Sequence, residues 1–205
     1  MAAQYPVNLV VDGRPCLVVG GGSVARRKVE GLLACGADVT VIAPSVDAAI
    51  AALPVRVVAR AYEPGDVIGY RLVVAATGDP SVNGTVFDDA EAAGVWVNAA
   101  DDPARCTFTL PAVARRGQLL VAVSTGGASP AMAAWLRDKI AAGLGEEYEV
   151  LLRLLSEARV TIQGSGRPTE DVDWPSVLDS HMLDLIRAGE IGKAREHLEA
   201  CLSSS

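Results

Sequence analysis

The feature that most constrains the fold is a glycine-rich stretch at residues 17–28, where an apolar run leads into three glycines and then into a helix-like pattern. Within it, Gly20, Gly22 and Ala25 follow the spacing G-x-G-x-x-A. In dinucleotide-binding proteins the first glycine permits a tight turn, and the second lets the backbone approach a pyrophosphate. The third small residue lets the helix pack on the sheet. The stretch therefore predicts a strand, a phosphate-binding loop and a helix.

The residues that follow these glycines support the prediction. Apolar positions recur at helical spacing over residues 24–35, interleaved with charged residues. Gly36 fits a glycine that ends a helix, and residues 38–42 have the composition of a second strand. A glycine-rich turn in an unrelated α/β protein is the alternative, but the strand-helix-strand context favours a dinucleotide site.

The end of the second predicted strand lacks the acidic residue that often binds the ribose hydroxyl groups of NAD. The sequence there is Ala43-Pro44-Ser45, and no arginine follows at once to hold the 2′-phosphate of NADP. We therefore expect Ser45 and nearby backbone groups to bind the ribose. We expect NAD rather than NADP as the cofactor.

Strand and helix patterns alternate through the first half of the chain. Further strands are expected at residues 8–11, 55–59, 72–76 and 95–98, and a helix begins at Asp79-Pro80. This order predicts an α/β fold with a Rossmann-type doubly wound parallel sheet. In such sheets the ligand lies beyond the carboxyl ends of the strands.

From about residue 107 the pattern changes. Two strands are expected at 107–110 and 119–124, and a helix at 129–142. Residues 146–160 are strongly helical with one apolar stripe, and shorter helices are expected near 175–188 and 190–202. We divide the chain into an NAD-binding domain at 1–112, a small α+β dimerisation and substrate segment at 113–145, and a C-terminal helical domain at 146–205.

Composition narrows the classes of function. Half of the 205 residues are hydrophobic, and no apolar run reaches the ~20 residues of a membrane-spanning helix. The net charge of −7 argues against bulk attraction to nucleic acid. The first residues lack the pattern of a signal peptide, and the four cysteines form no CxxC pair. We expect a cytoplasmic protein that binds no nucleic acid, no membrane and no resident metal.

Two later segments place polar groups at predicted strand ends. Asn98 ends a strand, and the carboxylates of Asp101 and Asp102 follow it. Residues 124–130 end another strand in hydroxyl groups and two glycines before a helix begins. Taken alone, each segment could be an ordinary capped turn. Beside the glycine loop, the carboxylates could accept a proton near a bound nicotinamide, and the second segment could hold ligand carboxylates.

Several of these stretches occur together, in one order, in a known family. They are VVGGGSVARRK, LLACGADVTVIAP, AYEPGD, VVAATGDPSVN, VNAADDPARCTF and VAVSTGGASP. With them, the chain resembles the precorrin-2 dehydrogenase family, which is also the N-terminal module of siroheme synthase. The resemblance covers residues 5–142 and is weaker through the tail. Siroheme synthases continue into a methyltransferase domain, so we expect this chain to be the stand-alone form.

The resemblance implies NAD-dependent oxidation of precorrin-2, a tetrapyrrole, to sirohydrochlorin by a homodimer. Some family members also insert ferrous iron as sirohydrochlorin ferrochelatases, and the sequence leaves this second activity open. A polycarboxylate substrate needs local cations, because desolvating a carboxylate is costly unless it is paired. Candidates by position alone are Arg105, Arg115, Arg116 and Arg137.

The resemblance also implies a set of site residues. Asp101 is the expected catalytic residue, with Asp102 as the adjacent candidate. The expected cofactor contacts are Gly20, Gly22, Ser23, Val24, Pro44, Ser45 and Thr77. The expected substrate contacts are Asn98, Ser124, Thr125, Gly126 and Gly127.

Two other functions are compatible with the glycine loop. A non-catalytic NAD-sensing domain would keep Gly20 and Gly22 but would not need Asp101 or residues 124–130. A dehydrogenase of another small substrate is the second alternative. The presence of both later segments favours the tetrapyrrole enzyme.

Overall fold

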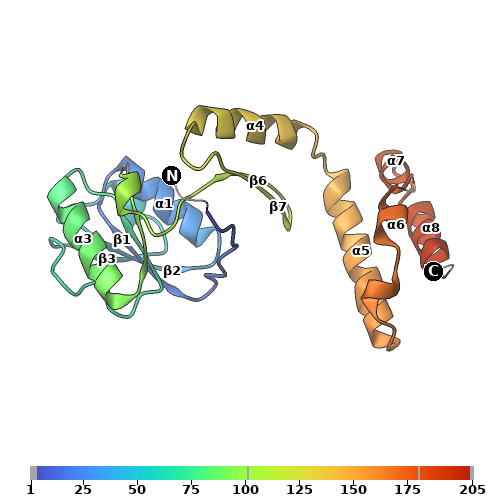
Figure 1. Ribbon diagram of the computed structural model, residues 1–205, viewed down its shortest axis with the longest axis horizontal. Helices are drawn as coiled ribbons and strands as arrows, with labels where there is room; N and C mark the ends of the chain where they lie inside the picture. Colours follow the sequence, from blue (N-terminus) through green and yellow to red (C-terminus); the bar gives the residue numbers. More distant parts are fainter. Residues whose placement is uncertain (1–3, 101, 180, 204–205) are drawn as a thin grey trace. The chain divides into compact units, whose positions relative to one another are not determined.

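The computed structural model describes residues 4–100, 102–179 and 181–203. The chain forms two compact units that divide between Leu110 and Pro111 (Figure 1). The predicted end of the first domain, at residue 112, lies close to this division. Residues 111–205 form one compact unit, and the predicted further division between residues 145 and 146 stays a prediction.

The first unit is built on a five-stranded parallel sheet in the order β3-β2-β1-β4-β5. Val19 of β1 is paired with Ile42 of β2 and with Ala75 of β4, so the carboxyl ends of three strands meet at one edge. This confirms the predicted Rossmann-type doubly wound sheet. The strands are β1 (Pro15–Val19), β2 (Asp38–Ile42), β3 (Arg56–Val58), β4 (Leu72–Ala75) and β5 (Trp96–Ala99).

Helices cover both faces of this sheet because successive side chains of a strand point to opposite faces. On one face, Val18 packs in a cluster with Val29 of α1 (Ser23–Leu33), and α2 (Ala48–Ala51) contributes to the same cluster. On the other face, Leu17 and Val19 pack in a cluster with Val86 of α3 (Pro80–Ala93). Strands buried on both faces are apolar at nearly every position, which explains the continuous apolar runs of the sequence.

Two of the predicted strands are wrong. Residues 8–11 have no strand pairing, and Val10 is 84% exposed. Residues 107–110 form no strand, although Cys106 makes an isolated bridge with Asn98 and the Thr107 amide donates to Val97. Both segments have apolar residues, but a strand also needs a neighbour that supplies a ladder of hydrogen bonds.

The second unit contains an antiparallel hairpin and five α-helices in its described residues. The hairpin turns at Gly117, whose φ of 53° lies in the left-handed region. Leu154, Met182 and Leu198 are buried in a core shared by the last four helices (Figure 1). The elements are β6 (Ala112–Arg116), β7 (Leu119–Val123), α4 (Pro130–Ala142), α5 (Glu147–Gly164), α6 (Trp174–Asp179), α7 (Met182–Arg187) and α8 (Ile191–Ser203).

The single helix predicted near residues 175–188 is two helices, α6 and α7. His181 precedes α7 with a φ of 44°, which a continuous helix does not permit. None of the helices in the described ranges is both long and apolar enough to cross a membrane.

We expect Cys35 to be alkylated by iodoacetamide well before Cys16 in the native protein at pH 8. Cys16 is fully buried in β1, and burial, together with the charge of Asp38, raises the pKa of its thiol to about 11. Cys35 is exposed, and the thiolate is the reactive form. Peptide mass spectrometry after brief labelling measures the two rates. Equal native rates would contradict the packing of β1, and equal rates in guanidinium chloride are the control.

Candidate functional site

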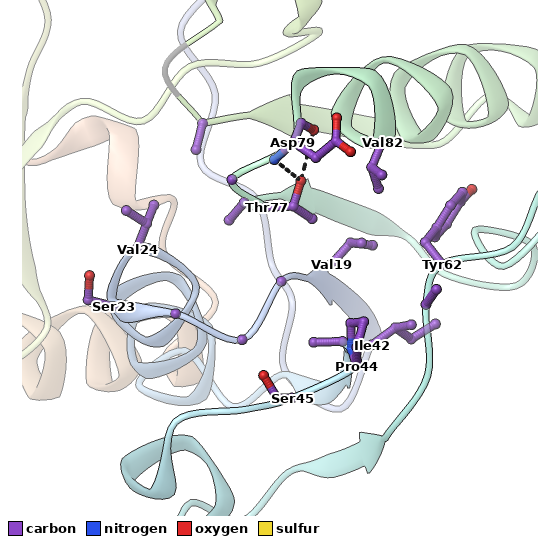
Figure 2. A pocket seen from close by; sticks show the side chains of 18 residues that line it. Val19, Ser23, Val24, Ile42, Pro44, Ser45, Tyr62, Thr77, Asp79 and Val82 are labelled. Carbon is purple, nitrogen blue, oxygen red and sulfur yellow. Dashed lines mark hydrogen bonds between the residues drawn. The ribbon is translucent and has the colours of Figure 1, made fainter.

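A cavity of about 710 Å³ lies at the carboxyl edge of the parallel sheet (Figure 2). Its walls come from the segments that follow all five strands. This is the edge at which open α/β sheets bind their ligands. The lining residues are Val19, Gly20, Gly21, Gly22, Ser23, Val24, Ile42, Ala43, Pro44, Ser45, Ala61, Tyr62, Ala76, Thr77, Gly78, Asp79, Val82 and Ala100.

The first two glycines of the loop are packed between neighbouring strand ends. Gly20 has a φ of 129°, and a Cβ there would collide with the carbonyl oxygen of Ala76. A Cβ on Gly21 would collide with the carbonyl oxygen of Ser45. Two backbone hydrogen bonds also hold the loop close to the segment at the end of β2. The Gly20 amide donates to the carbonyl of Ile42 at 2.9 Å, and the Asp47 amide donates to the carbonyl of Gly21 at 2.8 Å. Gly21 was missed by the sequence analysis, because the fingerprint allows any residue at that position.

Gly22 has a different environment from the other two glycines. A Cβ at this position would meet no atom within 4 Å, so nothing in the protein itself requires glycine there. Gly22 is the N-cap of α1, and no side chain caps the helix or places an acidic group in its first turn. The first amides of α1 and the positive end of its dipole can therefore bind an anion. Ser23 and Val24 line the cavity beside them.

The segment after β2 forms the adjoining wall. Pro44 and Ser45 are exposed and line the cavity, as expected for ribose contacts. Among the described lining residues the ionisable side chains are Tyr62 and Asp79, and none is cationic. A 2′-phosphate would therefore find no positive side chain in the wall, which supports NAD over NADP.

Thr77 lines the cavity, but its polar groups are already occupied. The buried Asn83 accepts hydrogen bonds from the Thr77 amide at 3.1 Å and from its hydroxyl at 2.8 Å, and donates to the Thr77 carbonyl at 3.2 Å. The Thr77 hydroxyl also accepts a bond from the Asp79 amide at 3.1 Å (Figure 2). Thr77 thus offers a ligand its carbon surface. Asn83 was missed by the sequence analysis, because a polar residue inside a helix carries no distinct signal.

Asp79 starts α3 at the rim of the cavity. Its carboxylate accepts hydrogen bonds from the hydroxyl of Ser81 at 2.7 Å and from the Ser81 amide at 2.8 Å. These bonds lower the pKa of Asp79 below its ordinary value. The carboxylate is thus committed to capping α3 as an anion.

The expected acidic pair follows β5 in the sequence. Ala100 lines the cavity, Asp101 lies outside the described residues, and Asp102 is not among the lining residues. Asp102 caps the short 3-10 helix η1 (Pro103–Arg105), accepting from the Ala104 amide at 3.2 Å. Its other carboxylate oxygen is 3.6 Å from the guanidinium of Arg105.

Arg105 holds this turn against α3. Its guanidinium donates to the carbonyl of Pro80 at 3.0 Å, and it lies so close to Gly84 that a Cβ there would be 3.1 Å from it. The structure therefore gives Arg105 an internal partner in addition to its suggested role in binding substrate carboxylates.

Asn98 is buried beneath the same turn. Its amide nitrogen donates to the carbonyl of Phe108 at 3.0 Å and lies 3.4 Å from the Cys106 sulfur. Burial raises the pKa of the Cys106 thiol, which donates toward the carbonyls of Ala99 and Asp102. Asn98 closes the turn and does not line the cavity, so its contact with substrate remains a prediction.

The remaining expected substrate residues belong to the second unit and follow β7. The Gly126 amide donates to the hydroxyl of Ser124 at 3.1 Å, and the Ser129 amide donates to the hydroxyl of Thr125 at 3.0 Å. Gly126 and Gly127 have φ values of 63° and 86°. These bonds form a fixed turn that leads into α4, whose N-cap is Ser129.

Two glycine variants separate the structural role of the loop from its ligand role. Gly22→Ala is expected to lower NAD affinity about tenfold or more, equivalent to roughly 1.4 kcal/mol, because its methyl group obstructs the pyrophosphate. Its effect on stability is expected to stay below about 1 kcal/mol. Gly21→Ala is expected to lose about 1–3 kcal/mol of stability because it overpacks the backbone of Ser45.

Thermal melts and isothermal titration calorimetry of both glycine variants measure these effects. If Gly22→Ala bound NAD as tightly as the native chain, the pyrophosphate would not lie at this loop.

Comparisons with known proteins agree with this geometry. A family model described as "Putative NAD(P)-binding" matches residues 7–112, and one described as "Sirohaem biosynthesis protein central" matches residues 116–142. The chain is 43% identical over 162 residues to a siroheme synthase of Methylococcus capsulatus, covering 77% of this chain and 34% of that protein. It is 37% identical over 209 residues to a siroheme synthase of Pseudomonas putida, covering 98% and 44%. The chain thus spans less than half the length of these curated relatives.

A solved structure matches nearly the whole chain. This is SirC, precorrin-2 dehydrogenase, with a TM-score of 0.69 and 30% sequence identity. The match covers 97% of this chain and 98% of SirC. Both units and all the motifs quoted from the sequence fall within these matches, and the chain therefore belongs to the precorrin-2 dehydrogenase family.

Proposed function

We propose that this chain oxidises precorrin-2 to sirohydrochlorin with NAD. The observation that carries the proposal is the uncapped start of α1 in a cavity that is also lined by Ala100, the residue before Asp101 in the sequence. The similarity to SirC over nearly the full length of both chains supports the same substrate. The balanced reaction is precorrin-2 plus NAD⁺ to sirohydrochlorin, NADH and one proton. NAD supplies the hydride acceptor when it is bound.

The residues of the cavity bind and orient the dinucleotide. The amides of Ser23 and Val24 at the start of α1 hold the pyrophosphate, helped by the helix dipole. Pro44 and Ser45 contact the adenosine ribose at the end of β2. Thr77 and Gly78 present an uncharged surface at the end of β4, fixed in place by Asn83.

We assign the proton released by the substrate to Asp101. Asp102 is a less suitable base, because its carboxylate already caps η1 and lies beside Arg105. Asp102 is also absent from the residues that line the cavity. Asp102 instead caps η1. In the second unit, the turn at residues 124–127 and the exposed Arg115 are proposed to bind substrate carboxylates.

Iron insertion is a separate step, in which ferrous iron is a substrate. Among the described residues, no group of three or more histidine, cysteine, aspartate or glutamate side chains is placed to hold a metal ion. Adding ferrous iron to the finished dehydrogenation reaction and following siroheme absorbance decides whether this chain also performs that step.

The cytoplasm, expected from the sequence, is the proposed location of this protein.

Asp101→Ala is expected to retain NAD binding and to lose at least about 100-fold in the rate of sirohydrochlorin formation, the usual contribution of a general base. The absorbance change of sirohydrochlorin measures the rate, and calorimetry measures NAD affinity. Asp102→Asn is the matched control, and we expect it to retain more activity because the amide oxygen still caps η1. Full turnover by Asp101→Ala would remove this residue from the mechanism. Absence of turnover by the native chain would remove the proposed reaction.

We also propose that the chain forms a homodimer through α4. Met132, Trp135 and Leu136 lie on one face of this helix and are 56%, 58% and 36% exposed. Lys139 continues the same face, with its ammonium 5.8 Å from the centre of the Trp135 ring. Large apolar side chains grouped on an exposed helix face are typical of a protein interface.

Trp135→Glu is expected to convert the dimer to a monomer, because a carboxylate would be buried in the apolar contact. Light scattering coupled to size-exclusion chromatography measures the mass. Val160→Glu, at an apolar position on α5 that is 67% exposed, is the matched control and should leave the dimer intact. A native chain that remains monomeric at every concentration would refute this interface.

A further inference from the structure

The far wall of the cavity contains an aromatic side chain to which no motif assigns a role. Tyr62 belongs to the segment after β3 and lines the cavity. Figure 2 shows its side chain beside Val82, on the opposite side of the cavity from Ser23 and Val24. The start of α1 and Tyr62 therefore lie on opposite sides of the space available to a ligand.

The hydroxyl of Tyr62 is committed within the protein. It donates to a carboxylate oxygen of Asp89 in α3 at 2.5 Å, and the Gly65 amide donates to the same oxygen at 3.0 Å. Burial, and then the bond to the Asp89 carboxylate, raise the pKa of the phenol, so it stays protonated and keeps donating. A ligand in the cavity therefore meets the ring of Tyr62.

The segment that carries Tyr62 is itself fixed. The guanidinium of Arg60 forms two bonds with the carboxylate of Asp66, each 2.7 Å long, and the Glu63 amide donates to the same carboxylate at 2.9 Å. Together with the bond from Tyr62 to Asp89, these contacts hold residues 60–66 against α3. Contacts that exist before the ligand arrives reduce the ordering cost of binding.

The surfaces around Tyr62 suit a planar apolar group. Ala61, Ile42 and Val82 present carbon atoms, and no charged side chain faces this end from the described lining residues other than Asp79, whose carboxylate is bonded to Ser81. A phosphate or a ribose here would lose hydration without gaining partners. Of the parts of NAD, the adenine ring best matches this surface.

The topology points to the same part of the ligand. If the pyrophosphate bound at α1 and the adenosine ribose at Pro44 and Ser45, the base would extend toward the segment after β3, because β3 is the next strand beyond β2 in the sheet. We propose that Tyr62, held by Asp89, is the stacking platform for the adenine ring of NAD, opposite Val82. This assignment rests on the proposed binding of NAD in this cavity. It places the nicotinamide at the other end, near Ala100.

The test measures binding of ADP-ribose, which contains the adenine end of NAD without the nicotinamide, by calorimetry on the intact chain. Tyr62→Ala is expected to weaken ADP-ribose about tenfold, within the range found for base–aromatic stacking. Tyr62→Leu keeps apolar volume but removes the planar ring, and a loss of similar size is expected. Tyr62→Phe keeps the ring and removes the bond to Asp89, so a smaller loss is expected. Tyr5→Ala, at an 88% exposed tyrosine outside the cavity, is the control.

Saturation-transfer NMR with NAD gives a second readout. In the native chain, strong transfer to the adenine protons is expected. In Tyr62→Leu this transfer should fall, while transfer to the nicotinamide protons is retained. An equal loss of saturation transfer at the adenine and the nicotinamide protons of NAD would overturn the adenine assignment. Unchanged ADP-ribose affinity in a Tyr62 variant that keeps the native melting transition would overturn it as well.

The outcomes also separate this assignment from the proposed function. If the native chain failed to bind NAD and ADP-ribose, both proposals would be refuted. If it bound both ligands through Tyr62 but did not oxidise precorrin-2, the adenine platform would stand and the dehydrogenase function would be wrong. If it oxidised precorrin-2 while Tyr62→Leu bound ADP-ribose normally, only the adenine platform would be wrong.

Discussion

The close approach of the glycine loop to two neighbouring strand ends is the contact on which the site depends. Gly20 lies against Ala76 and Gly21 against Ser45, with no room for a Cβ at either glycine. This packing brings the ends of β1, β2 and β4 together and directs the start of α1 into the cavity. Without it, the amides of α1 and the segments after β2 and β4 would not surround one space.

The parallel sheet was predictable because the residues of its strands show in the sequence which segments are buried. Strands covered on both faces need apolar residues at nearly every position, and the residues of β1 and β4 show this directly. The turn glycines and the helix start at Pro80 were visible for similar reasons. Residues 8–11 and 107–110 show the limit of such patterns, because whether a segment becomes a strand depends on a partner elsewhere in the chain.

The cavity was only partly predictable. Gly22, Ser23, Val24, Pro44, Ser45 and Thr77 were expected and all line it. Tyr62 and Val82 were not expected, because segments after β3 and within α3 reach the cavity only through the tertiary fold. Asn83 was hidden for the same reason, since its importance lies in three bonds to Thr77 that no spacing rule describes. The position of Asn98 beneath the turn after β5 likewise follows from its partners Phe108 and Cys106.

The missing cap of α1 has a consequence for how the protein responds to its cofactor. A helix whose first amides have no side-chain acceptor depends on solvent to satisfy them. A bound pyrophosphate would take the place of that acceptor and complete the helix. Cofactor occupancy and the stability of the first unit would then be linked, because a ligand that binds the folded state alone stabilises it. In a cell, the supply of the dinucleotide would influence how much of this protein remains folded.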